Sequence, residues 1–130
     1  MVRKIIILIQ IITIIVLLNM FRAPADNQAN PEKHYILKAS AYYPGPECTY
    51  PYDDGFTAIG DIAGKGCIAI DDKNGPLKMG QKVYVEGYGH GKCNDRGVAI
   101  KGWEIDLCFD TYEEAKEFGI KFVKVYVLGR

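Results

Sequence analysis

The stretch of sequence that decides the fold is NDRGVAIKGWEIDLCF, residues 94–109. Its second half, 104–109, has the composition of a β-strand, in which alternate side chains share a face. Asp106 stands between Ile105 and Leu107 and therefore points to the opposite face from these two apolar neighbours. Asp95 opens the stretch two residues before Gly97, in a loop. The stretch thus places two aspartates on either side of a glycine-containing turn.

Further strands and one helix flank this stretch. The segment 111–119 predicts a short helix, because Thr111 and Glu114 form a capping box and Gly119 suits the position after the helix. A loop with several Pro and Gly residues is expected at 43–56, and the glycine-dense segment 87–102 predicts tight turns or close backbone approaches. Alternating or apolar runs predict strands at 34–43, 66–70, 82–88, 104–109 and 121–128. Several short strands with one short helix predict an all-β domain of small α content, closed as a barrel.

Size and charge restrict the possible functions. With 130 residues the chain is one domain with a short appendage, which excludes a TIM barrel or a two-domain dinucleotide enzyme. Sixteen basic residues balance sixteen acidic ones, so the net charge gives no reason to expect a nucleic acid partner. The hydrophobic content of 48% argues against intrinsic disorder.

The N-terminus predicts export. Arg3 and Lys4 precede an almost unbroken apolar run from Ile5 to Phe21, as in a signal sequence or a single membrane anchor. An A-x-A-like pattern at 23–25 is a candidate cleavage site, and both fates remain open. We therefore expect a signal peptide or anchor at 1–25, a linker at 26–35, and the domain at 36–130.

Four cysteines, Cys48, Cys67, Cys93 and Cys108, leave three alternatives open. Outside the cytoplasmic membrane one or two disulfides can persist, with a pairing that the sequence does not give. Free buried thiols are the second alternative. A zinc site that adds His90 to Cys67, Cys93 and Cys108 is the third, although the spacing fits no standard zinc pattern.

Several of these motifs together resemble one known family, the 3D domain, which is named for three aspartates. The resemblance runs from about Ala39 to Leu128. Its most specific part is Asp95-x-Gly97-x-Ala-Ile-Lys-Gly102 followed by Ile105-Asp106-Leu107, and the three aspartates match Asp71, Asp95 and Asp106. It implies a six-stranded double-psi β-barrel, similar to that of membrane-bound lytic transglycosylase A. Stand-alone 3D proteins of endospore-forming bacteria resemble enzymes that cleave the cell wall.

The resemblance also implies an activity. It is cleavage of the MurNAc–GlcNAc β-1,4 bond of peptidoglycan with a 1,6-anhydro sugar as product, without cofactor or metal. Asp106 would act as acid and then as base, which requires that burial and neighbouring carboxylates keep it protonated. Asp95 and Asp71 would stay charged and stabilise the cation or orient the sugar. The residues expected to bind substrate are Thr57, Lys101, Gly97, Trp103 and Tyr42.

Three departures from the family pattern bear on this site. Asp72 stands where the family usually has a Pro after the first aspartate. Arg96 replaces the usual Thr and is expected to favour the ionised form of Asp95. Val98 replaces a Gly and adds bulk where a sugar would approach. The alternatives are a wall-binding module without catalysis, as in expansins, and a glycosidase that uses water. In each case peptidoglycan glycan strands are the expected partner, in the cell wall or at the outer face of the cytoplasmic membrane, and the membrane is a partner where the N-terminal segment stays uncleaved.

Overall fold

The computed structural model describes residues 1–20, 33–49 and 54–129. The chain divides into two compact units, 1–31 and 32–130. The first contains helix α1 (Val2–Met20). Among the described residues, no helix meets the combined length and apolarity needed to cross a membrane. The candidate cleavage site at 23–25 and most of the expected linker lie outside the described residues, so the predicted boundaries remain predictions.

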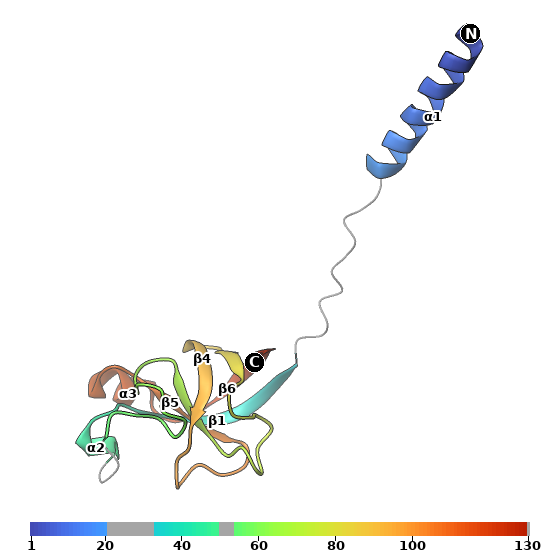
Figure 1. Cartoon of the computed structure of the whole chain (residues 1–130). Helices are drawn as coiled ribbons and strands as arrows, with labels where there is room; N and C mark the ends of the chain where they lie inside the picture. The colour runs from blue at the N-terminus through green and yellow to red at the C-terminus, as the bar shows by residue number, and fades with distance from the viewer. Residues whose placement is uncertain (21–32, 50–53, 130) are drawn as a thin grey trace. The chain divides into compact units, whose positions relative to one another are not determined.

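The second unit is a closed six-stranded barrel, which confirms the predicted fold class (Figure 1). Its strands follow one another around the barrel in the order β1-β5-β2-β4-β3-β6. Two pairs of strands, β1–β5 and β2–β4, are parallel, and the other pairs are antiparallel. The strands are β1 (His34–Tyr42), β2 (Cys67–Ile70), β3 (Lys82–Val85), β4 (Gly89–Asp95), β5 (Glu104–Cys108) and β6 (Lys121–Gly129).

Apolar side chains fill the barrel. All four residues of β2 are buried, which explains its continuous apolar sequence. Strand β3 instead alternates exposed and buried residues, because one face meets water. Complete burial of a Leu, Ile or Val side chain stabilises a fold by about 1.5–3 kcal/mol. Largest among the fully buried side chains are those of Leu37, Ile68, Leu77, Ile105 and Leu107.

Two short helices accompany the barrel. Helix α3 (Tyr112–Phe118) confirms the predicted helix, and the Thr111 side chain accepts a hydrogen bond of 3.2 Å from the Glu114 backbone N–H. Gly119 follows it with φ of 67°, a conformation that favours glycine. Helix α2 (Pro46–Thr49) lies in the segment expected to be only a loop. Pro46 occupies its first position, where a missing N–H costs no helical hydrogen bond.

Strand β4 was not predicted. It occupies part of the glycine-dense segment, where turns or close backbone approaches were the expectation. The backbone of Gly91 lies close to β2 and to the residue before it. A Cβ at this position would lie 2.6 Å from Ile68 Cδ1 and 3.0 Å from Gly66 O. Glycine at this position therefore lets β4 pack against β2.

All four cysteines are unbonded in the structure, as in the free-thiol alternative. Cys48 is exposed, whereas Cys67, Cys93 and Cys108 are buried. Within the described part of the chain, no group of three His, Cys, Asp or Glu side chains is placed to hold a metal ion.

Candidate functional site

Strand pairing places Asp106 in the middle of three strands. In register, Asp106 pairs with Ser40 of β1 on one side and with Ala69 of β2 on the other. The Ser40 hydroxyl donates a hydrogen bond of 2.9 Å to Asp106 Oδ1. Both neighbours are small, so the carboxyl group of Asp106 remains open to a hollow that Ala69 also lines.

The environment of Asp106 favours its protonated form. Burial raises its pKa from the ordinary 3.8 to about 6, and the nearby charge of Asp95 acts in the same direction. Hydrogen bonds from the Ser40 hydroxyl and the Leu107 backbone oppose this rise and do not cancel it. The predicted cause, burial together with repulsion between carboxylates, is therefore present. At mildly acidic pH a large fraction of Asp106 can donate a proton.

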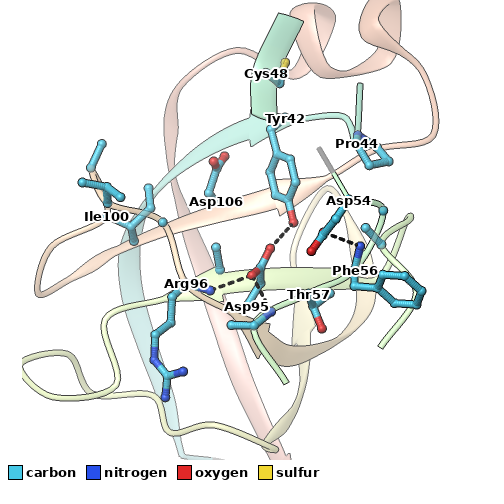
Figure 2. Close-up of a pocket in the computed structure, with 17 residues that line it drawn as sticks. Tyr42, Pro44, Cys48, Asp54, Phe56, Thr57, Asp95, Arg96, Ile100 and Asp106 are labelled. Atoms are coloured by element: carbon cyan, nitrogen blue, oxygen red, sulfur yellow. Dashed lines mark hydrogen bonds between the residues drawn. The ribbon is translucent and has the colours of Figure 1, made fainter. Parts of the chain in front are cut away.

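Asp95 lies at the end of β4, where three hydrogen bonds orient its carboxylate. The Tyr42 hydroxyl donates to Oδ2 over 3.0 Å, as Figure 2 shows. The backbone N–H groups of Ala58 and Arg96 each donate to Oδ1 over 2.9 Å. Burial, helped by the Cys108 thiol and Asp95, raises the pKa of Tyr42 far above its ordinary value, so Tyr42 stays a neutral donor.

Asp95 and Asp106 line the same hollow, which has a volume of about 550 Å³. We call it the groove. Strands β1, β2, β4 and β5 and the loops at 54–58 and 96–100 contribute to its walls. Its other lining residues are Tyr42, Pro44, Cys48, Asp54, Gly55, Phe56, Thr57, Ala58, Ala63, Ala69, Arg96, Gly97, Val98, Ala99 and Ile100.

Asp71, the third aspartate, does not line the groove. It lies in an adjoining hollow of about 400 Å³, which shares Arg96, Gly97 and Ile100 with the groove. Its carboxylate accepts hydrogen bonds from the backbone of Gly102 (2.9 Å) and Asn74 (3.1 Å). These and further donors hold the pKa of Asp71 well below its usual range. Asp71 thus ties its own turn to the Gly102 loop.

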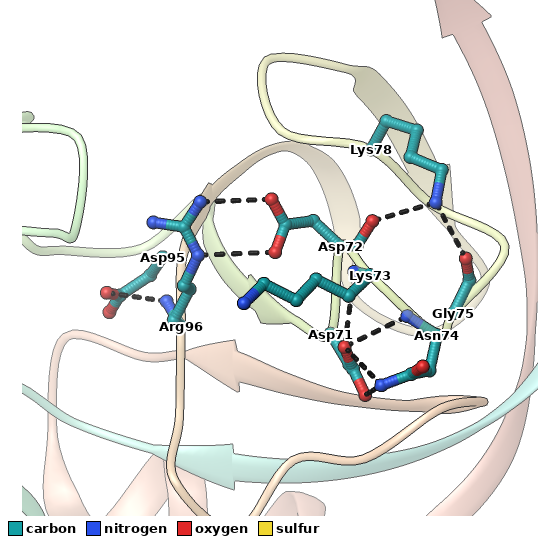
Figure 3. A network of polar contacts seen from close by, with 8 residues as sticks. All are labelled: Asp71, Asp72, Lys73, Asn74, Gly75, Lys78, Asp95 and Arg96. Carbon is teal, nitrogen blue, oxygen red and sulfur yellow. Dashed lines mark hydrogen bonds and ion pairs between the residues drawn. The ribbon is translucent and has the colours of Figure 1, made fainter.

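Arg96 contacts two aspartates, one through its backbone and one through its side chain. Its backbone N–H reaches Asp95, but its guanidinium forms a two-pronged ion pair with Asp72, at 3.0 and 3.2 Å (Figure 3). Asp72 is the residue that replaces the family's usual Pro. Two of the three departures from the family pattern, Arg96 and Asp72, therefore form one contact, which holds the guanidinium on Asp72.

The expected substrate-binding residues fall into three places. Tyr42, Thr57 and Gly97 line the groove, and the Thr57 hydroxyl also accepts the Asp61 N–H over 3.1 Å and so closes a turn. Lys101 lines the adjoining hollow. Trp103 lines neither; it is 56% exposed, and its ring lies nearly perpendicular to that of Tyr35, with 5.7 Å between the ring centroids.

Two groups at the site were missed by sequence reasoning. Ser40, which contacts Asp106, lies in a strand that looks merely structural, and its role depends on its register with β5. The Ala58 N–H, which contacts Asp95, comes from a loop 37 residues away. A backbone donor leaves no signal in side-chain patterns.

The arrangement provides one partly buried carboxyl that can be protonated and a second carboxylate, oriented by three donors, in one groove. This pair suits acid–base chemistry on a polar polymer such as a glycan. The second unit is thus a small closed β-barrel with a groove that three carboxyl groups line, those of Asp54, Asp95 and Asp106.

Comparison with known proteins agrees with this description. Residues 66–129 match the family model of the 3D domain, a match that begins later than the resemblance from Ala39. This segment of the chain is therefore a 3D domain. It is 47% identical over 62 residues to the cell wall-binding protein YocH, and 46% identical over 62 residues to the putative cell wall shaping protein YabE, both of Bacillus subtilis (strain 168). These matches cover 48% of this chain but only 21% and 15% of the relatives.

Proposed function

We propose that this protein acts on the bacterial cell wall as a lytic transglycosylase, which cleaves the MurNAc–GlcNAc β-1,4 bond of peptidoglycan. The 3D domain and two relatives named for the cell wall support a role there. The observation that carries the catalytic proposal is the raised pKa of Asp106, about 6, in the groove that Asp95 also lines.

In the first step, the protonated carboxyl of Asp106 donates its proton to the glycosidic oxygen. The bond between that oxygen and C1 of the muramyl sugar breaks, and positive charge develops on the sugar. The carboxylate of Asp95 stabilises this charge. This carboxylate is already held in position by hydrogen bonds from Tyr42, Ala58 and Arg96. Little reorganisation of the site is therefore needed as the positive charge develops.

In the second step, Asp106 is a carboxylate and accepts the proton of the muramyl C6 hydroxyl. The C6 oxygen bonds to C1, which closes the 1,6-anhydro ring without consuming water. Asp106 thereby regains its proton for the next cycle. Asp71 contributes by holding the turn at 71–75 against the loop at Gly102, because its carboxylate is already occupied by their N–H groups.

The test is digestion of purified peptidoglycan by the full chain, with mass spectrometry of the soluble muropeptides. Anhydro products, lighter than hydrolytic products by the mass of one water, support the proposal. Asp106→Asn is expected to abolish their release. Glu117→Gln, the same change on the exposed face of α3, is the matched control and is expected to leave release unchanged. Products that are heavier by one water, as hydrolysis gives, would contradict the proposal and indicate a hydrolase.

A second candidate is wall binding without cleavage, which the name of the cell wall-binding protein YocH favours. The groove would then hold a glycan strand, and Val98, 83% exposed at its wall, would limit how closely a sugar approaches. Sedimentation with insoluble peptidoglycan separates the two candidates. Binding with no soluble muropeptide between pH 4 and 8 would favour this one, whereas release of anhydro products supports catalysis.

We further propose that the barrel acts outside the cytoplasm. Arg3 and Lys4 before the apolar run support export, and the cell wall names of both relatives agree with it. Whether residues 1–25 are removed or retained as an anchor is answered by the N-terminal sequence of the protein recovered from producing cells.

A further inference from the structure

Two cysteines lie across from each other next to the candidate site. In the antiparallel pair β2–β5, Ile68 stands opposite Leu107 and Ala69 opposite Asp106. One step along the same register, Cys67, the first residue of β2, faces Cys108, the last residue of β5. Opposite residues of an antiparallel pair have Cα atoms about 4.5–5.5 Å apart, which lies within the range that a disulfide spans.

The other cysteines are not placed in this way. Cys67 and Cys108 share a small buried cluster with Tyr42, whereas Cys93 belongs to the main core and Cys48 lies exposed on α2. The cross-strand position therefore selects one of the possible pairs.

We propose that Cys67 and Cys108 form a disulfide in the mature protein. This rests on the export that forms part of the proposed function, because disulfides persist outside the cytoplasm. Both thiols lose a proton and together give two electrons to a disulfide of a thiol–disulfide oxidoreductase or of a small thiol such as glutathione. The oxidant is released as two thiols, and a bond forms between the two sulfur atoms.

The disulfide would form before the barrel closes. In the folded protein, burial raises the pKa of the Cys108 thiol to about 12, so it stays protonated and attacks a disulfide slowly. The sulfurs now contact different groups: Cys67 Sγ lies 3.4 Å from Ile62 O, and Cys108 Sγ lies 3.7 Å from Phe109 O. A disulfide requires the two sulfurs to turn away from these carbonyls and to approach each other to about 2.05 Å.

The Tyr88 hydroxyl already bridges the same strand ends. It accepts a hydrogen bond of 2.6 Å from the Gly66 N–H and donates one of 2.6 Å to Cys108 O. The backbone beside both cysteines is therefore held in place without a covalent bond. The disulfide would add a covalent link to strand ends that are already fixed together.

The position of this pair connects it to the candidate site. Cys108 pairs with Tyr42 of β1, and two residues earlier Asp106 pairs with Ser40. Because alternate residues of a strand share a face, the cysteine pair lies in the row next to Asp106. The disulfide would tie together β5, which carries Asp106, and β2, which carries its cross-strand neighbour Ala69.

The test is a map of the thiols in the full chain, purified in mild detergent after refolding in a mixture of oxidised and reduced glutathione. Free thiols are alkylated in denaturant, and the proteolytic peptides are identified by mass spectrometry. We expect one linked peptide that joins Cys67 to Cys108, with Cys48 and Cys93 alkylated. Four alkylated cysteines, or a link that includes Cys48 or Cys93, would overturn the proposal.

Thermal melting of the same protein gives a second measurement. The link closes a loop of roughly 40 residues, so reductant is expected to lower the melting midpoint by more than about 10 °C. Cys93→Ala, the matched control, is expected to keep both the linked peptide and the response to reductant, and Cys108→Ser to lose both. A response to reductant that persists in Cys108→Ser would contradict the proposal, and the thiol map of the unaltered chain decides it even where a variant does not fold. Neither readout depends on cleavage of peptidoglycan.

Discussion

Replacement of Asp106 by Asn is expected to stabilise the protein at neutral pH while it removes activity. Asn keeps the shape of the side chain and an oxygen that can accept the hydrogen bond from Ser40. What it removes is the cost of a buried negative charge. That cost follows from the pKa of Asp106, which rises from 3.8 to about 6 on folding.

The magnitude follows from linkage between protonation and folding. Between about pH 4 and 6 the folded state binds more protons at Asp106 than the unfolded state does, so the stability due to this group falls as pH rises. Below the unfolded pKa the group is neutral in both states and costs nothing. Above about pH 6 the full cost is present, about 3 kcal/mol at 1.36 kcal/mol for each pKa unit.

The assay is urea unfolding of the full chain and of Asp106→Asn at pH 4 and pH 7.5. We expect nearly equal free energies of unfolding at pH 4, and at pH 7.5 a variant that is more stable by up to about 3 kcal/mol. Other carboxyl groups have lowered pKa values and therefore stabilise the fold more as pH rises; these include Asp71, Asp72 and Glu104. Their contributions are the same in both proteins and cancel in the difference between the two free energies of unfolding.

The exposed control Glu117→Gln is expected to show no such gap at either pH. A difference between Asp106→Asn and the unaltered chain that is the same at both pH values would refute the reasoning. So would a variant that is less stable at pH 7.5, because the charge of Asp106 would then be stabilising.

Three further predictions concern the same site. If Asp106 must be protonated to act, the rate of muropeptide release at low substrate falls about tenfold per pH unit above about pH 6, and a rate that is constant from pH 6 to 8 would contradict that role. Tyr42→Phe removes the donor to Asp95, and we expect release to slow by roughly tenfold and the free energy of unfolding to fall by about 1 kcal/mol; an unchanged rate would show that this hydrogen bond does not serve catalysis. The exposed Arg96–Asp72 pair is expected to contribute less than about 1 kcal/mol of coupling in a double-mutant cycle measured by urea unfolding, and a larger value that salt does not weaken would show a buried, structural pair.

The sequence was enough to predict several elements because their signals are local. The capping pair Thr111 and Glu114 predicted α3, and the apolar run 67–70 predicted β2. Strand β4 was missed because glycines in a strand look like turn residues, and only the packing of Gly91 against Ile68 distinguishes the two. A contact between strands leaves no local signal.

The site shows the same division. The residue types and the pattern around Asp95 and Asp106 pointed to carboxylate chemistry, and both line one groove. The ion pair between the Arg96 guanidinium and Asp72 was not predicted, since residues that are 24 positions apart in the chain meet only in the folded structure. Likewise, nothing in the sequence showed that N–H groups occupy the Asp71 carboxylate.

By itself, then, the sequence determined the class of the fold, the helix α3 and the identity of the acidic residues, because hydrophobic alternation, capping and composition act over a few residues. Only the tertiary structure decided which groups contact Asp106, which groups orient Asp95, and which cysteines share a cluster. Those properties depend on strand register, and register brings together residues that are tens of positions apart in the chain.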